Sequence, residues 1–455
     1  MDQLQFCARS GVPLALPDPV MTSRRMLAGL VGLLLLTVSP AFAQQSTSNP
    51  KIDRGLRESL RAGAATQRVI IVVQPGHRAE IRTALEQHGD RIKGEHPFVN
   101  ALSATIHSAD VTEMANHPWV KSMSIDATVF AGAAAGVAGG AKPVSPGIVV
   151  SPIPAPRPSG LNTLRQTLGL PSVSTSLTPS GTSVGVAVID SGIAPLSDFN
   201  GRITGFYDFT KGGIPTAPFD DYGHGTHVAG LIGASGLLSN NEFQGIAPNV
   251  NLVGLKVLDS LGQGSTSDVI RAIEYVTANK DRLHVQVINL SLGHPIYAPA
   301  KDDPMVQAVE QASAAGLIVV VSAGNFGQNP KTGAGGYTGL TSPGNAPSCI
   351  TIGAVMSGDT VMRDDDAVAP YSSRGPTWFD AFAKPDLVAP GHNLVSDTVT
   401  SSTLYTRLTT LRRTSRNGKA FLSLSGSSMA TAVTSGVVAV LIDAHNRANY
   451  YGARP

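Results

Sequence analysis

The chain has 455 residues, of which 42% are hydrophobic and 15% are charged, and its formal net charge is +2. This length predicts two folded units joined by linkers, and this composition is too apolar for a disordered chain. The small net charge argues against nucleic acid or a strongly acidic surface as the main partner. Cys7 and Cys349 are the whole thiol content, so removal of a leader that contains Cys7 would leave no partner for a disulfide.

Residues 1–43 are interpreted as an upstream extension followed by a signal peptide. Two arginines precede an apolar run from 26 to 36, and the small-residue cleavage site Ala41-Phe42-Ala43 follows. A membrane anchor is the weaker interpretation, because the run is shorter than the roughly 20 residues that span a bilayer. Met21 is the expected start, and no second span is expected. The protein is therefore predicted to be secreted, extracellular or periplasmic, without a stable membrane span.

A small α+β domain is predicted over residues 67–128. Residues 44–66 before it are polar and are expected to be flexible. Strands are expected over 68–74, 98–107 and 120–125, and helices over 77–88 and from 108 onward. Their order indicates a β-α-β-β-α-β, ferredoxin-like arrangement. Residues 129–160 are rich in Ala, Gly and Pro, which is typical of a linker that is open to cleavage.

Residues 161–455 alternate strands with helices. The strands are apolar and β-branched without polar alternation, which favours a parallel sheet covered on both faces. Strands are expected at 184–189, 252–257, 285–290, 317–321 and 350–352, and helices at 227–237, 267–278 and 305–315. This order predicts right-handed crossovers and an α/β three-layer sandwich with a mostly parallel central sheet. Ligands in such sheets bind beyond the carboxyl ends of the strands.

Three short segments carry the reactive side chains. Val-Ile-Asp-Ser-Gly ends a predicted strand at Asp190, Gly-His-Gly-Thr-His contains His224, and Gly-Ser-Ser-Met-Ala contains Ser428. A serine hydroxyl needs a base within hydrogen-bond reach, and the base needs a partner that fixes its tautomer. We therefore predict that Ser428 is the nucleophile, His224 the general acid and base, and Asp190 the carboxylate that orients His224.

Each segment also has a plainer interpretation. Ser428 alone is more often a helix N-cap, and His224 with His227 has the spacing of a metal site, although no third ligand is obvious nearby. A strand-end carboxylate such as Asp190 can bind a nucleotide, but the turn after it lacks Gly-x-Gly-x-x-Gly. An esterase of the α/β-hydrolase type would need Gly-x-Ser-x-Gly and a later histidine, and neither surrounds Ser428.

Taken together, the three segments resemble the subtilisin family of serine endopeptidases. The resemblance covers about residues 68–126 and 180–445. It implies an oxyanion hole formed by Asn325, in Ser-Ala-Gly-Asn, and the backbone N–H of Ser428, and it makes His227 structural. It also implies a peptide cleft whose two edges carry Gly262 and Gly264 on one side and Ser291, Leu292 and Gly293 on the other.

The resemblance also assigns a role to residues 67–128. The order of their elements and the phrase His117-Pro-Trp-Val resemble the propeptide that assists folding and inhibits the cleft until it is cut. An independent small binding domain is the alternative. The family needs no cofactor for its chemistry; structural calcium is common in it, but no ligands are assigned here.

The expected function is a secreted endopeptidase that cleaves proteins and peptides through an acyl-enzyme. Self-processing is expected within 127–140. Two rivals stay open. A dead protease that only binds peptides would share every motif, and the chain ends soon after Ser428, where family members commonly continue. An autotransporter would need a long C-terminal barrel, for which the residues after Ser428 are too few.

Overall fold

The computed structural model describes residues 49–132, 163–170, 178–329, 331–358 and 360–450. The predicted signal peptide and most of the predicted linker lie outside these residues. Residues 49–126, called the N-terminal domain below, contain a four-stranded antiparallel sheet with the order β2-β3-β1-β4. Its elements are β1 (Thr66–Val73), α2 (Arg78–Gln87), β2 (Arg91–His96), β3 (Ala101–His107), α3 (Val111–Asn116) and β4 (Val120–Ile125). The β-α-β-β-α-β order expected from the sequence is present.

The segment expected to be flexible instead contains a helix, α1 (Arg54–Arg61). Asp53 caps this helix by accepting the N–H of Leu56, and Leu56 is buried in the core of the N-terminal domain. Leu60 packs against the same core. These two leucines, four residues apart, are the only apolar side chains of the helix. The pair defines a buried face, but it is too small to stand out as a pattern in a polar segment.

The central sheet of the second domain is mostly parallel, as expected. Its strands follow the order β16-β15-β13-β11-β6-β9-β7-β8, and β17 lies beside β15. The edge strands β16 and β8 are antiparallel to their neighbours, and the others are parallel. The bounds are β6 (Gly185–Asp190), β7 (Ile203–Asp208), β8 (Ile214–Pro215), β9 (Asn251–Lys256), β11 (Val287–Leu290), β13 (Ile318–Ser322), β15 (Ile350–Met356), β16 (Ala367–Val368) and β17 (Leu387–Pro390).

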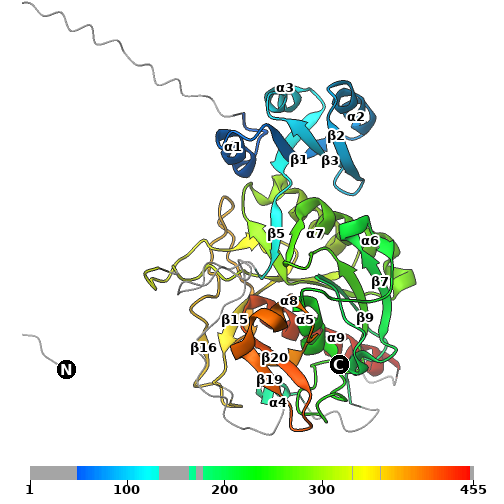
Figure 1. Ribbon diagram of the computed structural model, residues 1–455, viewed down its shortest axis with the longest axis vertical. Helices are drawn as coiled ribbons and strands as arrows, with labels where there is room; N and C mark the ends of the chain where they lie inside the picture. The colour runs from blue at the N-terminus through cyan, green and yellow to red at the C-terminus, as the bar shows by residue number, and fades with distance from the viewer. Residues whose placement is uncertain (1–48, 133–162, 171–177, 330, 359, 451–455) are drawn as a thin grey trace, which may run out of the picture. The chain divides into compact units, whose positions relative to one another are not determined.

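Two pairs of helices cover the sheet. Helices α5 (His224–Gly233) and α9 (Ser427–Tyr450) pack together, and α9 also packs on β11, β13 and β15 (Figure 1). Helices α6 (Thr266–Leu283) and α7 (Pro304–Ala314) form the second pair, which packs on β6 and β13. These pairs and the sheet confirm the three-layer α/β sandwich. The shorter helices are α4 (Thr163–Thr167) and α8 (Thr403–Arg407), with 3-10 turns at Ser197–Phe199, Phe209–Lys211, Ala300–Asp302 and Thr409–Leu411.

Helix α9 was not expected to resemble a membrane span. Among the described residues, its stretch Ser427–Asn449 is the one that is long and apolar enough to cross a bilayer, but 78% of its most apolar window is buried inside the structure. The core helix of a water-soluble protein has the same features, because a helix that is apolar all round is buried wherever it occurs. This one helix is therefore only weak evidence for a second span.

Two smaller sheets complete the second domain. The first has the order β10-β5-β12-β14, and the second has the order β18-β20-β19. Their strands are β5 (Thr128–Ala131), β10 (Gln263–Ser265), β12 (Leu292–Pro295), β14 (Thr341–Ser342), β18 (Leu394–Asp397), β19 (Arg412–Thr414) and β20 (Ala420–Leu424). Residues 129–131 were expected to be linker. They pair instead with strands more than 130 positions away in the sequence, which composition cannot reveal.

Candidate active site

The candidate site lies where the order of the strands reverses. Strand β6 comes first in the chain; β7 and β9 lie on one side of it, whereas β11, β13 and β15 lie on the other. Such a switch point leaves a crevice beyond the carboxyl ends of the strands. Asp190 is the last residue of β6, Ser291 directly follows β11, and Asn325 follows β13. Three of the predicted residues therefore share one edge of the sheet.

Asp190 and His224 are in direct contact. His224 Nδ1 lies 2.8 Å from Oδ1 and 2.9 Å from Oδ2 of Asp190, and both side chains are buried. An ionised carboxylate can only accept, so Nδ1 of His224 carries the proton. In the neutral form of this ring, the other nitrogen, Nε2, carries a lone pair and can act as a base. The N–H of Ser191 also donates to Asp190, at 2.7 Å, which fixes the carboxylate.

Glycines on both sides of His224 make this contact sterically feasible. Gly223 has φ of +101°, a left-handed conformation that begins α5. A Cβ on Gly225 would lie 2.1 Å from the carbonyl oxygen of Gly192, the second residue after Asp190. Any side chain at position 225 would therefore push the start of α5 away from the end of β6.

Asp220 was not predicted from the sequence, yet it holds the turn that precedes His224. Its Oδ1 accepts the N–H of Gly223 at 2.7 Å and the hydroxyl of Ser191 at 2.9 Å. Its Oδ2 accepts both the N–H and the hydroxyl of Thr226, at 2.8 and 2.7 Å. Burial raises the pKa of Asp220 above its usual value, although these donors oppose the shift. The sequence offered one signal for Asp220: it is an aspartate four residues before the first residue of α5, and aspartates near helix starts often accept backbone N–H groups.

Lys256, the last residue of β9, is a second residue that the sequence did not single out. Its buried ammonium donates to the carbonyl oxygens of Ser191 and Leu258, both at 2.8 Å, and to Asp221 at 2.6 Å. A buried lysine is rarely stable unless its donors are all satisfied. Here it ties the segment after Asp190 to the end of the neighbouring strand.

His227 does not share a site with His224. Its Nε2 lies 3.1 Å from the carbonyl oxygens of Leu394 and Leu422, which belong to β18 and β20. Burial lowers the pKa of His227 to about 3, so the ring stays neutral and donates to these acceptors. Nε2 of His227 and Nδ1 of His224 are therefore bound to separate acceptors.

Ser428 is buried near the start of α9. Its hydroxyl donates to the carbonyl oxygen of Ser291 at 3.1 Å, and the hydroxyl of Ser291 donates to the carbonyl oxygen of Ser428 at 3.1 Å. Ser428 is thus held beside the end of β11, the strand next to the one that carries Asp190. No hydrogen bond joins Ser428 to His224 within the described residues.

Asn325 lies against the same end of α9. Its Oδ1 accepts the N–H of Ser427 at 2.8 Å, and the N–H of Gly324 donates to the hydroxyl of Ser427 at 3.1 Å. A Cβ on Gly426 would lie 3.2 Å from Nδ2 of Asn325, so glycine lets the amide approach closely. The N–H groups of Ser427, Met429 and Ala430 already have acceptors. The remaining N–H of this first turn, that of Ser428, and the side-chain amide beside it suit a negatively charged oxygen.

The predicted cleft residues surround β5. Along one edge, Gly264 pairs with Val129 and the carbonyl oxygen of Gly262 accepts the N–H of Ala131 at 3.2 Å. Along the other edge lie the following pairs: Leu292 with Ala131, and Gly293 with Phe130. Val129 and Ala131 are buried and alternate with half-buried neighbours. The segment is held by main-chain bonds on both sides.

The end of β5 reaches Ser428. The N–H of Gly132, the residue after β5, donates to the carbonyl oxygen of Ser291 at 3.0 Å. The same oxygen accepts the hydroxyl of Ser428. Two donors that share one acceptor must lie close together, so the backbone at Gly132 is adjacent to Ser428.

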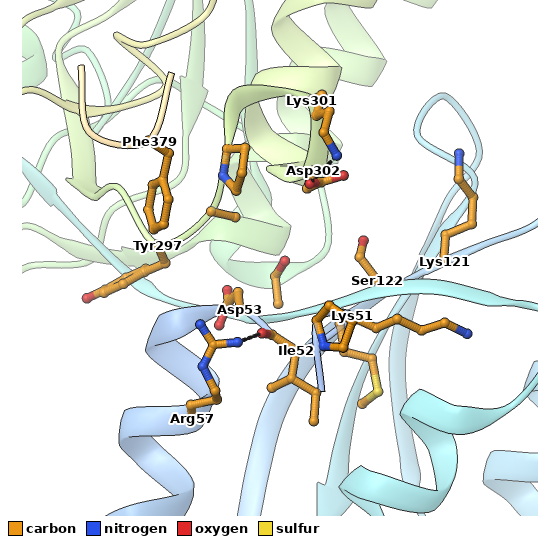
Figure 2. Close-up of a pocket in the computed structure, with 15 residues that line it drawn as sticks. Lys51, Ile52, Asp53, Arg57, Lys121, Ser122, Tyr297, Lys301, Asp302 and Phe379 are labelled. Atoms are coloured by element: carbon orange, nitrogen blue, oxygen red, sulfur yellow. Dashed lines mark hydrogen bonds and ion pairs between the residues drawn. The ribbon is translucent and has the colours of Figure 1, made fainter. Parts of the chain in front are cut away.

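A different pocket, of about 290 Å³, lies away from these residues (Figure 2). Residues of the N-terminal domain, including Asp53 and Arg57, face Tyr297 and Phe379 across it. Arg57 donates to the carbonyl oxygen of Ile52, and burial raises the pKa of Asp53 to about 7. The pocket is lined by none of the predicted site residues, and because residues of both domains line it, it lies at the seam between them.

Comparisons with known proteins agree with this geometry. The model of the family described as "Subtilase family" matches residues 181–453. The serine protease AprX of Bacillus subtilis (strain 168) is 40% identical over 270 residues, which are 58% of this chain and 58% of AprX. Subtilisin E from the same strain is 28% identical over 434 residues, which cover 93% of this chain and 90% of that protein.

Among solved structures, fervidolysin from Fervidobacterium pennivorans, a keratinolytic enzyme related to subtilisin, has a TM-score of 0.60 at 20% identity. That match covers 84% of this chain and 55% of fervidolysin, and it supports the fold alone. The chain spans less than two thirds of the length of AprX and of fervidolysin. The family model, by contrast, matches more than half of this chain and includes all of the predicted reactive residues. The chain belongs to the subtilase family of serine endopeptidases.

Proposed function

We propose that this chain is a secreted endopeptidase that hydrolyses proteins through an acyl-enzyme and removes its own N-terminal domain. The observation that carries the proposal is β5. This segment of the chain lies as an added strand between β10 and β12, and its last amide shares the carbonyl oxygen of Ser291 with the hydroxyl of Ser428. Strand addition is how extended peptides bind when main-chain bonds supply the affinity.

The chemistry follows from the positions of the side chains. Ser428 Oγ attacks the peptide carbonyl carbon while its proton passes to Nε2 of His224, and Asp190 accepts the Nδ1–H of the imidazolium. The developing oxyanion is stabilised by the amide of Asn325 and the backbone N–H of Ser428. His224 then protonates the leaving amine. Water, deprotonated by His224, attacks the acyl-enzyme and releases the new carboxylate and Ser428.

Self-processing is assigned to the bond between Gly132 and Ala133. The N–H of Gly132 lies beside Ser428, and Ala131 and Val129 enter the cleft before it. This narrows the expected interval of 127–140 to one bond. The N-terminal domain would then act as a propeptide, because its release is required before another peptide can occupy the place of β5.

Polar contacts support the inhibitory role of the N-terminal domain over that of an independent binding module. The ammonium of Lys93 donates to the hydroxyls of Ser265 and Ser267, at 2.7 and 2.8 Å, and contacts Asp268 at 3.2 Å. The N–H of Phe98 donates to Glu274 at 2.9 Å. All these partners lie at or near α6, close to the β10 edge of the cleft. Secretion is part of the proposal and rests on the leader predicted over 21–43.

The test is maturation and activity of the purified full-length chain. We expect release of a fragment whose first residue is Ala133, together with casein hydrolysis. Ser428→Ala should stay full length and inactive, whereas Ser401→Ala, a change at an exposed serine, should behave as the parent chain. Normal maturation of Ser428→Ala without added protease would refute the assignment, and a first residue other than Ala133 would refute the position of the cut.

A further inference from the structure

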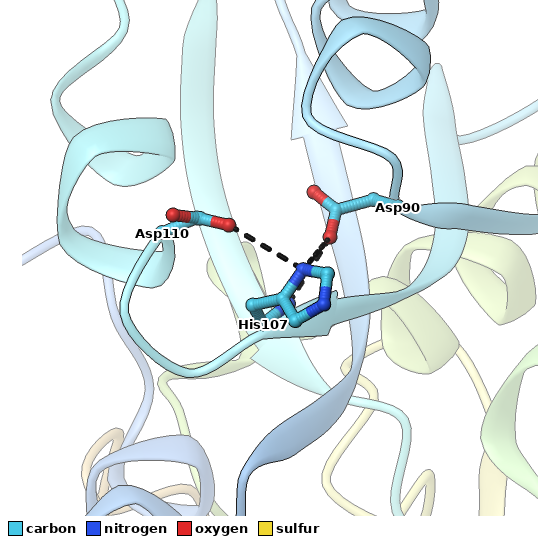
Figure 3. Close-up of side chains that lie close together, drawn as sticks. All are labelled: Asp90, His107 and Asp110. Atoms are coloured by element: carbon cyan, nitrogen blue, oxygen red, sulfur yellow. Dashed lines mark hydrogen bonds and ion pairs between the residues drawn. The ribbon is translucent and has the colours of Figure 1, made fainter.

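A second cluster of reactive side chains lies within the N-terminal domain, where two chain reversals meet (Figure 3). Asp90 directly precedes β2, His107 ends β3, and Asp110 directly precedes α3. One ligand atom from each lies within 4.8 Å of the others. The cluster stands at the opposite end of β2 and β3 from Phe98, which contacts the second domain. It takes no part in the proposed catalysis.

The spacing of the three groups suits a metal ion. Nδ1 of His107 lies 3.1 Å from Oδ1 of Asp90 and 3.6 Å from Oδ2 of Asp110. A tetrahedral site with bonds of about 2.0–2.1 Å places its ligand atoms about 3.4 Å apart. The two measured distances lie on either side of that value, and the third, between the two carboxylates, is at most 4.8 Å.

Both carboxylates also have unused capacity. The side chain of Asp90 is fully buried, and its Oδ2 has no hydrogen-bond partner among the described residues, whereas Oδ1 accepts from the backbone and the ring of His107. Leaving a buried carboxylate oxygen unpaired costs free energy. Asp110 occupies the N-cap position of α3 but accepts no bond from the helix. Figure 3 shows its carboxylate turned toward His107 instead.

We propose that Asp90, His107 and Asp110 bind a divalent transition-metal ion of the zinc class. One imidazole with two carboxylates is a set that zinc accepts, with water in the fourth position. Calcium is a poorer fit, because it takes six to eight oxygen ligands. His88, whose Nδ1 lies 3.9 Å from Oδ2 of Asp110, is near enough to replace the water after a small rotation.

Such an ion would fasten the turn between α2 and β2 to the turn between β3 and α3. It would stabilise the fold of the N-terminal domain, because a ligand that binds only the folded form shifts the equilibrium toward it. This site does not depend on the proposed peptidase activity, and its test needs no catalysis.

The test is a titration of the chelator-treated, full-length Ser428→Ala chain with zinc chloride in a calorimeter. We expect one zinc per chain at micromolar affinity or tighter. His107→Ala removes a half-exposed ligand and should weaken binding by more than about 100-fold, beyond the 10- to 100-fold typical of a residue that only supports a ligand. Asp110→Asn should weaken it in the same direction.

The matched control is His77→Ala. His77 is another histidine of the N-terminal domain, pairs with Glu80 at 3.2 Å and lies outside the cluster. The Ser428→Ala chain with the added change His77→Ala should bind zinc as tightly as the Ser428→Ala chain alone. The proposal is overturned if that chain binds no zinc, or if His107→Ala and Asp110→Asn, folded by circular dichroism, bind it as tightly as His77→Ala.

Discussion

Asp126 provides the sharpest test of how the N-terminal domain is held. This buried residue directly follows β4, and its carboxylate accepts the N–H of Ser267 at 2.8 Å and the hydroxyl of Ser267 at 2.9 Å. Ser267 lies in the first turn of α6, whose own N-cap is Ser265. The N-terminal domain thus supplies a negative charge to the N-terminus of a helix in the second domain, where free N–H groups favour it.

The size of the effect can be worked out from these contacts. A hydrogen bond to a charged group contributes about 1.5–3 kcal/mol, and every 1.4 kcal/mol corresponds to a factor of ten in an equilibrium constant. Because both bonds go to one residue, we count them as a single unit. Asp126→Ala should therefore raise the inhibition constant of the N-terminal domain by about 10- to 150-fold.

The assay is inhibition of the mature enzyme by added segment 49–132, measured with a chromogenic peptide. Glu113→Ala, which removes an exposed carboxylate from α3, is the control and should leave the inhibition constant unchanged. Asp126→Asn keeps one acceptor oxygen, so its inhibition constant should lie between those of Asp126→Ala and Glu113→Ala. A change below about threefold for Asp126→Ala, similar to that of the control, would refute the reasoning.

Three further predictions follow from the site and from the interface. Asn325→Ala should lower kcat by about 10²–10³ with little change in KM, a magnitude that comes from subtilisin itself and not from this structure; an unchanged kcat would contradict the oxyanion role. Gly225→Ala should abolish casein hydrolysis, because its Cβ would meet a backbone oxygen at 2.1 Å, and full activity would refute this. The last concerns pH and the urea midpoint of the Ser428→Ala chain. Burial lowers the pKa of His96 from 6.5 to about 3, so the stability it confers is complete above pH 6.5 and is lost as the pH falls toward 3. Burial raises the pKa of Glu274 from 4.5 to about 7, so the destabilisation it causes is greatest above pH 7 and is relieved as the pH falls to 4.5. The difference in urea midpoint between variant and parent should therefore be more positive at pH 5 than at pH 8 for His96→Phe and more negative at pH 5 than at pH 8 for Glu274→Gln, and differences of the opposite sign would contradict the two shifts.

Features that depend on a few neighbouring residues, such as buried strands and helix starts, could be predicted from the sequence. The buried strands show as apolar runs of β-branched residues, so the position of Asp190 at the end of a strand follows from the sequence alone. His224 stands out because Gly223 and Gly225 flank it at the start of a helix, where close approach demands a residue without a side chain, and Ser428 stands out because Gly426 lies two residues before it at the start of another. The roles of these residues in catalysis remain predictions that the proposed experiments address.

The sequence could not reveal features that depend on distant partners. The residues of β5 are followed by a stretch rich in Ala, Gly and Pro, which has the composition of a linker. Only the pairing of this segment with β10 and β12 makes it a strand. Asp220 and Lys256 are common residue types, and their importance comes from being buried beside Asp190. Helix α1 was missed because its apolar face consists of two leucines.

Labelling by a fluorophosphonate tests the central claim most directly. The reagent bonds only to a serine whose hydroxyl is activated, and mass spectrometry of the mature protein identifies that serine. We predict one label per chain, on Ser428, and its loss in His224→Ala that has been matured by added parent enzyme. Failure of Ser428 to react in folded mature protein, or equal labelling of His224→Ala, would contradict the proposal that Asp190, His224 and Ser428 act as one catalytic unit.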